Sequence, residues 1–179
     1  VLEAKYEIPY LAHAAIEPLN CVVKVDKNQC EMWFASQMPT IDQMEVGKVT
    51  GLKPEQIKIN SLYAGGSFGR RACANDYVVD AANIAKQLPG RTVKMVWTRE
   101  DEILNARYRP MAVHHIRGAV SPDGKALAWQ HHAAAQSILR GTPFEAMVKG
   151  PVDGTIAEGI EHMHYAIPHL QVQGSEVPI

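Results

Sequence analysis

Residues 57–97, IKINSLYAGGSFGRRACANDYVVDAANIAKQLPGRTVKMVW, decide the fold. Residues 57–63 alternate between apolar and polar side chains, as a half-buried strand does. Residues 74–88 repeat apolar side chains at helical spacing, and Pro89 with Gly90 ends that pattern. A second alternating segment closes the stretch. The order strand, glycine loop, helix, strand predicts a crossover unit whose two strands run parallel.

The segments on either side favour antiparallel pairing. Residues 21–35 predict a hairpin with its turn at residues 26–29, and residues 111–136 predict another around the sequence PDG. Residues 169–177 form a last strand. Helices are expected at residues 40–52, with Thr40 as N-cap, and directly after Thr98. The prediction is an α+β fold with a mixed sheet, as one domain over residues 1–179 that is part of a longer chain.

The composition bears on the possible partners and on the state of the cysteines. The 179 residues carry a net charge of -1, and no basic stripe indicates nucleic acid as a partner. None of the three cysteines belongs to a CxxC pair. In the first hairpin, Cys21 and Cys30 share a face but lie at its opposite ends, beyond the roughly 7 Å Cα separation that a disulfide spans. We therefore expect buried free thiols.

The glycine loop GGSFG, residues 65–69, is the strongest candidate site. Glycines between a strand and a helix let the backbone approach a ligand with its amide groups exposed. The loop lacks both the GK[ST] of a P-loop and the GxGxxG spacing of a dinucleotide site. Arg70 and Arg71 follow where the helix is expected to begin, and an anion there would offset their charge. The alternative is a tight connection with two surface arginines that pair with acids such as Asp76.

Four motifs together resemble a known family: PYLAHAAIEPLNC (9–21), GGSFGRR (65–71), VKMVWTREDEI (93–103) and YRPMA (108–112). In this order they resemble the large subunit of molybdenum hydroxylases, the xanthine dehydrogenase and aldehyde oxidase family. The GGxFGRR form is nearest the isoquinoline 1-oxidoreductase and molybdenum aldehyde dehydrogenase type. The resemblance covers most of residues 3–176.

The resemblance implies a molybdopterin cofactor, in bacteria as its cytosine dinucleotide. The pterin dithiolene holds the metal, so no side chain of this chain is expected to ligate it. The implied cofactor-binding positions are Gly65, Gly66, Ser67, Phe68, Gly69 and Arg70. The histidine pairs at 114–115 and 131–132, and the sequence HMH at 162–164, are interpreted as structural or surface residues.

The resemblance also implies a substrate class and partners. Leu11 and Ala72 stand where xanthine dehydrogenases carry glutamine and glutamate, so an aldehyde or N-heterocycle fits better than a purine. His13 and Glu17 are expected to brace the loop. The family's general base lies in a later segment, so no catalytic residue is assigned here, and the isolated chain is expected to be inactive.

The implied partners are the remaining large-subunit segments and an iron–sulfur subunit. Exposed apolar side chains, with residues 141–148 among the candidates, favour a homo-oligomer as well. The sequence is compatible with either the bacterial periplasm or the cytoplasm as the compartment. The alternative to the whole interpretation is a non-catalytic α+β interaction module without a cofactor.

Overall fold

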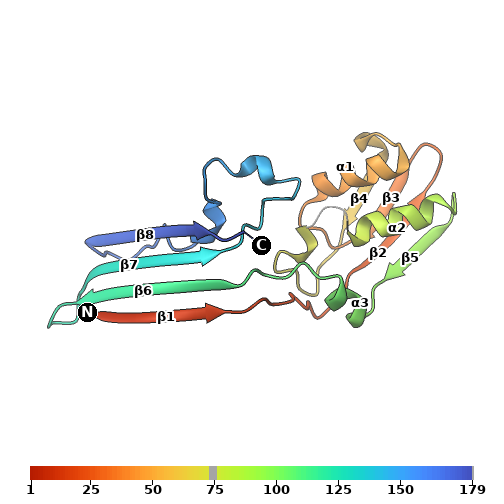
Figure 1. Cartoon of the computed structure of the whole chain (residues 1–179). Coiled ribbons are helices and arrows are strands. Elements are labelled where there is room, and N and C mark those ends of the chain that lie inside the picture. Colours follow the sequence, from red (N-terminus) through yellow and green to blue (C-terminus); the bar gives the residue numbers. More distant parts are fainter. Residues whose placement is uncertain (73–75, 179) are drawn as a thin grey trace. The chain divides into compact units, whose positions relative to one another are not determined.

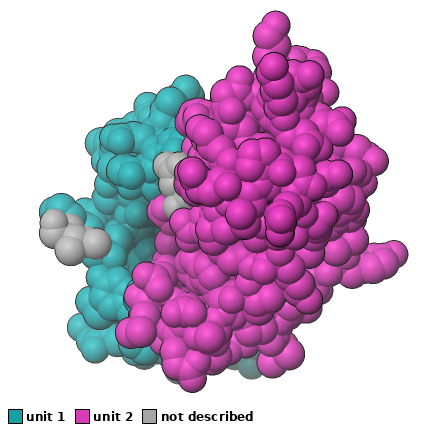
Figure 2. All heavy atoms as spheres, turned by 90° about the vertical axis from the view of Figure 1, so that its right-hand side faces the viewer, with its two compact units in different colours: residues 1–11, 108–179 teal, residues 12–107 magenta. Residues whose placement is uncertain are grey.

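The structure is a computed structural model and describes residues 1–72 and 76–178 (Figure 1). Strands in two mixed sheets and a few helices confirm the α+β prediction. The chain divides into two compact units, coloured separately in Figure 2. Unit 1 contains residues 1–11 and 108–179, and unit 2 contains residues 12–107. The single domain over residues 1–179 therefore stays a prediction.

Unit 2 is built on the sheet that the crossover predicts. Its strands are β2 (Asn20–Val25), β3 (Cys30–Phe34), β4 (Ile57–Ser61) and β5 (Thr92–Val96), in the order β4-β3-β2-β5. The β2–β3 hairpin pairs Val25 with Cys30 and is antiparallel, as predicted. Strand β4 is parallel to β3, and β5 is antiparallel to β2. Strands β4 and β5 therefore run in the same direction, although β3 and β2 lie between them.

Helices α1 (Pro39–Thr50) and α2 (Tyr77–Lys86) cover one face of this sheet (Figure 1). Alternate residues of β2 and β3 point toward the helices, as the strand period of two requires. The buried residues of this core are Leu19, Cys21, Val23, Val25, Cys30, Met32, Phe34, Val46, Ile57, Tyr77, Val78, Ala81, Ala82 and Ala85. Cys21 and Cys30 are both buried free thiols, as predicted.

Two helix starts differ from the prediction. Helix α1 begins at Pro39 after Met38, because proline suits the first helical turn, so Thr40 is not the N-cap. Helix α2 begins at Tyr77, where the Asp76 carboxylate accepts a hydrogen bond from the Tyr77 backbone N–H at 2.7 Å. The expected start at Arg70 is wrong. The predicted helical residue Ala74 lies outside the described residues.

A third helix, α3 (Arg99–Leu104), follows Thr98 as predicted. The Thr98 hydroxyl accepts from the Asp101 N–H at 3.1 Å, and the Asp101 carboxylate accepts from the Thr98 N–H at 3.1 Å. This reciprocal pair is a capping box, which satisfies two donors at the helix start. None of the helices in the described residues is long and apolar enough to cross a membrane.

Unit 1 is a four-stranded sheet in the order β1-β6-β7-β8. Its strands are β1 (Leu2–Ile8), β6 (Ala112–Val120), β7 (Ala126–Ala135) and β8 (His169–Glu176). The predicted β6–β7 hairpin is present, and β8 is parallel to β7. Short 3-10 turns at Glu145–Met147 and Gly154–Ala157 lie in the β7–β8 connection.

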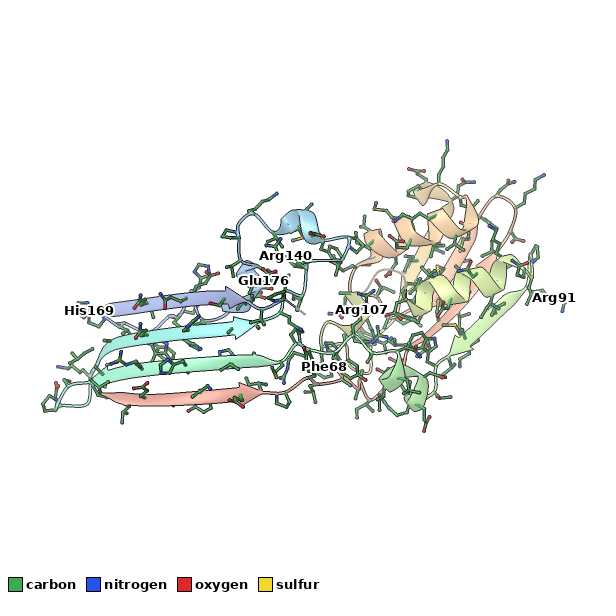
Figure 3. All side chains as sticks on the ribbon, viewed as in Figure 1. Phe68, Arg91, Arg107, Arg140, His169 and Glu176 are labelled. Carbon is green, nitrogen blue, oxygen red and sulfur yellow. The ribbon has the colours of Figure 1, made fainter. Side chains whose placement is uncertain are left out.

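The unit 1 sheet has an apolar face that is only partly covered. Leu2, Tyr6 and Leu170 share that face and are each more than two-fifths exposed. Within the described part of unit 1, Ala133 is the one buried hydrophobic residue. In the β7–β8 connection, Arg140 donates to the Glu176 carboxylate at 2.5 Å (Figure 3). Polar contacts of this kind help to hold that connection against β8.

Candidate functional site

The glycine loop adopts a conformation that needs its glycines. Gly66, Phe68 and Gly69 have φ values of 105°, 56° and 93°, in the left-handed region. Phe68 is the unusual member, because a bulky residue rarely adopts a positive φ. At Gly65 the constraint is contact: a Cβ there would lie 2.5 Å from the Cβ of Glu17. The loop backbone therefore approaches the neighbouring segment more closely than a side chain permits.

The loop leaves a row of backbone donors without acceptors. The Gly65 N–H donates to the Glu17 carboxylate at 2.8 Å, and the Arg70 N–H donates to the Ser67 carbonyl at 2.8 Å. Between them, the N–H groups of residues 66–69 meet no acceptor among the residues that the structure describes. Phe68 stands at the exposed tip, with 73% of its surface accessible (Figure 3). Successive free amides of this kind form a concavity suited to an anion.

Arg70 is buried and makes its charged contacts inside unit 2. Its guanidinium pairs with both carboxylate oxygens of Asp76, the longer bond being 3.3 Å, and lies 5.6 Å from the centre of the Trp97 ring. Asp76 is thus the acid that the alternative sequence interpretation named. That interpretation placed the arginines on the surface, whereas both are at most 2% exposed.

Arg71 joins the glycine loop to the segment around Glu17. Its Nε donates to the Gly66 carbonyl at 3.0 Å, and its Nη2 donates to both the carbonyl and the carboxylate of Glu17, each at 3.0 Å. The Arg71 backbone N–H donates to the Gln37 side chain at 3.1 Å. Sequence reasoning missed Gln37, since nothing in the sequence brings residues 37 and 71 together.

Glu17 braces the loop, as the sequence analysis expected. Its backbone N–H donates to the Gly65 carbonyl at 3.0 Å, and its carboxylate accepts from Gly65, Asn20 and Arg71. Burial alone would raise the Glu17 pKa, but hydrogen bonds from Asn20 and Gly65 and the Arg71 charge lower it below its usual value. His13, the other expected brace, has its Nε2 3.8 Å from where a Cβ on Gly69 would stand.

A separate hollow of about 420 Å³ in unit 2 has an acidic lining. It is lined by Asp76, Asp80, Trp97, Asp101, Asn105 and Arg107. Burial and the neighbouring Asp76 charge raise the pKa of Asp80. Its carboxylates make this hollow a poor anion site, so the free amides of residues 66–69 are the better candidate.

The histidines on strands β6 and β7 contact one another and neighbouring strands. His114 Nδ1 lies 2.9 Å from His131 Nε2, and His132 Nε2 lies 2.8 Å from the Ser175 hydroxyl. Burial and the nearby His114 lower the pKa of His131. The described residues contain no cluster of three or more histidine, cysteine or acidic side chains that could hold a metal ion.

Comparison with known proteins identifies the family. A family model described as the molybdopterin cofactor-binding domain matches residues 1–178. The chain belongs to this family. This agrees with the resemblance to molybdenum hydroxylases that the four sequence motifs carry.

Relatives of this molybdopterin-binding domain include subunits of oxidoreductases. It is 33% identical over 128 residues to the isoquinoline 1-oxidoreductase subunit beta of Brevundimonas diminuta, covering 70% of this chain and 16% of the relative. It is 28% identical over 146 residues to the aldehyde oxidoreductase molybdenum-binding subunit PaoC of Escherichia coli K12, covering 82% and 20%. The chain therefore spans a fifth or less of the length of these relatives.

A solved structure confirms the fold of the domain. Quinoline 2-oxidoreductase from Pseudomonas putida 86 superposes with a TM-score of 0.68 over 97% of this chain and 22% of that one. The two are 18% identical, so the likeness establishes the fold alone.

Proposed function

We propose that this domain provides part of the molybdopterin site of an oxidoreductase that hydroxylates aldehydes or N-heterocycles with oxygen from water. The observation that carries the proposal is the row of free N–H groups at residues 66–69. In a family described as a molybdopterin cofactor-binding domain, these donors would hold the anionic oxygen or sulfur atoms of the cofactor. The family match extends over residues 1–178 and favours this function over a cofactor-free interaction module.

The loop fits such a group in three respects. Its donors are backbone amides, which do not titrate and hold fixed positions. Gly65 and Gly66 let the loop backbone pack against Glu17 and Ala15, where a Cβ would clash, so the loop lies close to the segment that supports it. Phe68, exposed beside the amides, offers an apolar surface that excludes water from one side. The Arg70 guanidinium is engaged with Asp76, so we propose that Arg70 contributes through its backbone rather than through its charge.

The reaction that this proposal assigns balances as R–H + H₂O → R–OH + 2 H⁺ + 2 e⁻. When bound, the molybdenum cofactor supplies the centre that takes up the two electrons. The residues of this domain bind and orient the cofactor through the amides of residues 66–69. A group outside this chain removes the proton from water, because none of the described acids near the loop is free of a structural partner: Glu17 and Asp76 each hold an arginine.

Finer features of the proposal follow the relatives. The cytosine dinucleotide form and an iron–sulfur subunit as electron acceptor are proposed from the resemblance of the four sequence motifs to bacterial molybdenum hydroxylases. The names of these two relatives specify an N-heterocycle and an aldehyde as the substrate classes.

The test uses the complete encoded protein, purified with the subunits that accompany it. Molybdenum is measured by elemental analysis, and the released cofactor and its nucleotide are identified by mass spectrometry. Benzaldehyde and isoquinoline are then oxidised in ¹⁸O-water with an artificial electron acceptor. We expect about one molybdenum per large subunit and ¹⁸O in the product. A protein without molybdenum and pterin, purified from cells that load a related enzyme, would contradict the proposal.

A further inference from the structure

We infer that Arg71 is a positioning residue, which fixes the conformation of the 65–69 loop so that its free amides face the cofactor. The inference rests on the proposed function, but its geometry is independent of it. The hydrogen bonds of the Arg71 guanidinium go to the Gly66 carbonyl and to Glu17. The Arg71 side chain is fully buried behind the loop and acts on the ligand only through the backbone that it holds.

The guanidinium connects two segments that are far apart in the sequence. Three hydrogen bonds, all at 3.0 Å, run from Arg71 to the Gly66 carbonyl and to two acceptors of Glu17. Gly65 and Glu17 complete the junction with their own pair of hydrogen bonds, at 2.8 Å and 3.0 Å. The two segments cannot slide past each other without breaking this whole set.

The junction is also anchored to the core of unit 2. The Tyr77 hydroxyl, at the start of helix α2, donates to the Ala35 carbonyl at 2.9 Å. Burial raises the Tyr77 pKa, and the positive charge of Arg71 opposes that rise. The Arg71 backbone N–H is held by Gln37, directly before helix α1. Arg71 therefore ties the loop to the residues that lead into helix α1.

The loop needs such support because its conformation is costly. Phe68 at a positive φ is a backbone conformation that persists only where surrounding contacts determine it. A lysine cannot replace the arginine here, since its single ammonium does not reproduce the fork that bonds Gly66 and Glu17 at once. The loss of this fork frees the loop to relax from the conformation in which the N–H groups of residues 66–69 meet no protein acceptor.

The decisive variant is Arg71→Lys, with Arg91→Lys as the matched control. Arg91 undergoes the same chemical change but is exposed, at the far end of unit 2 from Phe68 (Figure 3). Both variants are made in the complete protein. We measure molybdenum per subunit, kcat per bound molybdenum, the thermal midpoint, and amide hydrogen exchange of residues 63–72 against strands β2 and β3.

We expect Arg71→Lys to hold less than half the wild-type molybdenum and to turn over more slowly per bound metal. Exchange at residues 63–72 rises at least tenfold, while β2, β3 and the Arg91→Lys control keep wild-type exchange. Faster exchange throughout residues 12–107 would mean a merely structural role and would overturn the inference. Full loading with unchanged loop exchange would also overturn it.

Two further arms separate the inference from the proposed function. If the wild-type protein holds no molybdenum, the proposed function is refuted, whatever Arg71 does. If the wild type and the Arg71→Lys variant hold equal amounts of molybdenum, only the positioning role is refuted. If Arg71→Lys does not fold, Glu17→Gln removes the negative charge and one of the two acceptor oxygens and keeps the backbone contacts of Glu17. Reduced loading of that variant at an unchanged thermal midpoint supports the inference, and full loading contradicts it.

Discussion

Arg70→Ala is expected to destabilise unit 2 rather than simply to weaken cofactor binding. The substitution leaves the Asp76 carboxylate, 6% exposed, without its cation in a protein interior. Removing one partner of a buried ion pair costs about 3–5 kcal/mol. The contact with Trp97 adds about 0.5–1 kcal/mol. Since whole domains are stable by about 5–15 kcal/mol, this is a large fraction of the total.

The assay is pulse proteolysis of the cofactor-free complete protein across a urea series, with fragments from residues 12–107 quantified by mass spectrometry. Arg91→Ala, at an exposed position, serves as the control and should change stability by less than about 0.5 kcal/mol. In the double variant Arg70→Ala/Asp76→Asn, the buried charge is gone and the helix cap keeps an acceptor. We expect this variant to recover at least half of the lost stability.

The opposite pattern would refute this reasoning. If Arg70→Ala costs less than about 1 kcal/mol and yet abolishes cofactor retention, the guanidinium serves the cofactor and its pairing with Asp76 is incidental.

Three other predictions concern the Asp42 carboxyl, the two buried cysteines and Gly65. Burial raises the pKa of Asp42 to about 6, so stability is greatest below the unfolded pKa near 4 and falls as pH rises through 6. Asp42→Asn should therefore stabilise the protein by up to about 3 kcal/mol at pH 8 and have little effect at pH 4, as measured by urea denaturation at both pH values; equal effects would contradict this. Burial raises the pKa of Cys21, and of Cys30 to about 11, so neither thiol should react with iodoacetamide at pH 8 until the protein is unfolded. Gly65→Ala places a methyl group against Glu17 and should lower both stability, by about 1–3 kcal/mol, and molybdenum content; full loading would show that the loop tolerates the shift.

The sequence predicted helices and strands more reliably than it predicted the contacts between them. Strand alternation identified the β2–β3 and β6–β7 hairpins, because a period of two is a local property of the chain. The prediction that β4 and β5 run in the same direction was also correct. That β3 and β2 lie between these strands depends on long-range pairing, which no local pattern encodes.

For the candidate site, too, the sequence predicted the local element and missed its long-range contacts. The glycine spacing predicted a loop with free amides, since glycine's freedom at positive φ is intrinsic to the residue. The apolar repeat that follows the loop placed Arg70 at the start of α2, although two cations oppose the helix dipole at that end. The structure instead buries Arg70 against Asp76 and Arg71 against Glu17. Only the folded chain brings residue 17 beside residue 71.

The central claim is that the N–H groups of residues 66–69 contact the anionic part of a molybdopterin cofactor. The most direct measurement is an experimental structure of the complete protein with its cofactor bound. We predict that at least two of these four nitrogens lie about 2.7–3.2 Å from cofactor oxygen atoms, or somewhat farther from sulfur, with Arg71 still bonded to Gly66 and Glu17. A cofactor bound elsewhere, with the four amides facing solvent or satisfied by protein acceptors, would contradict the account.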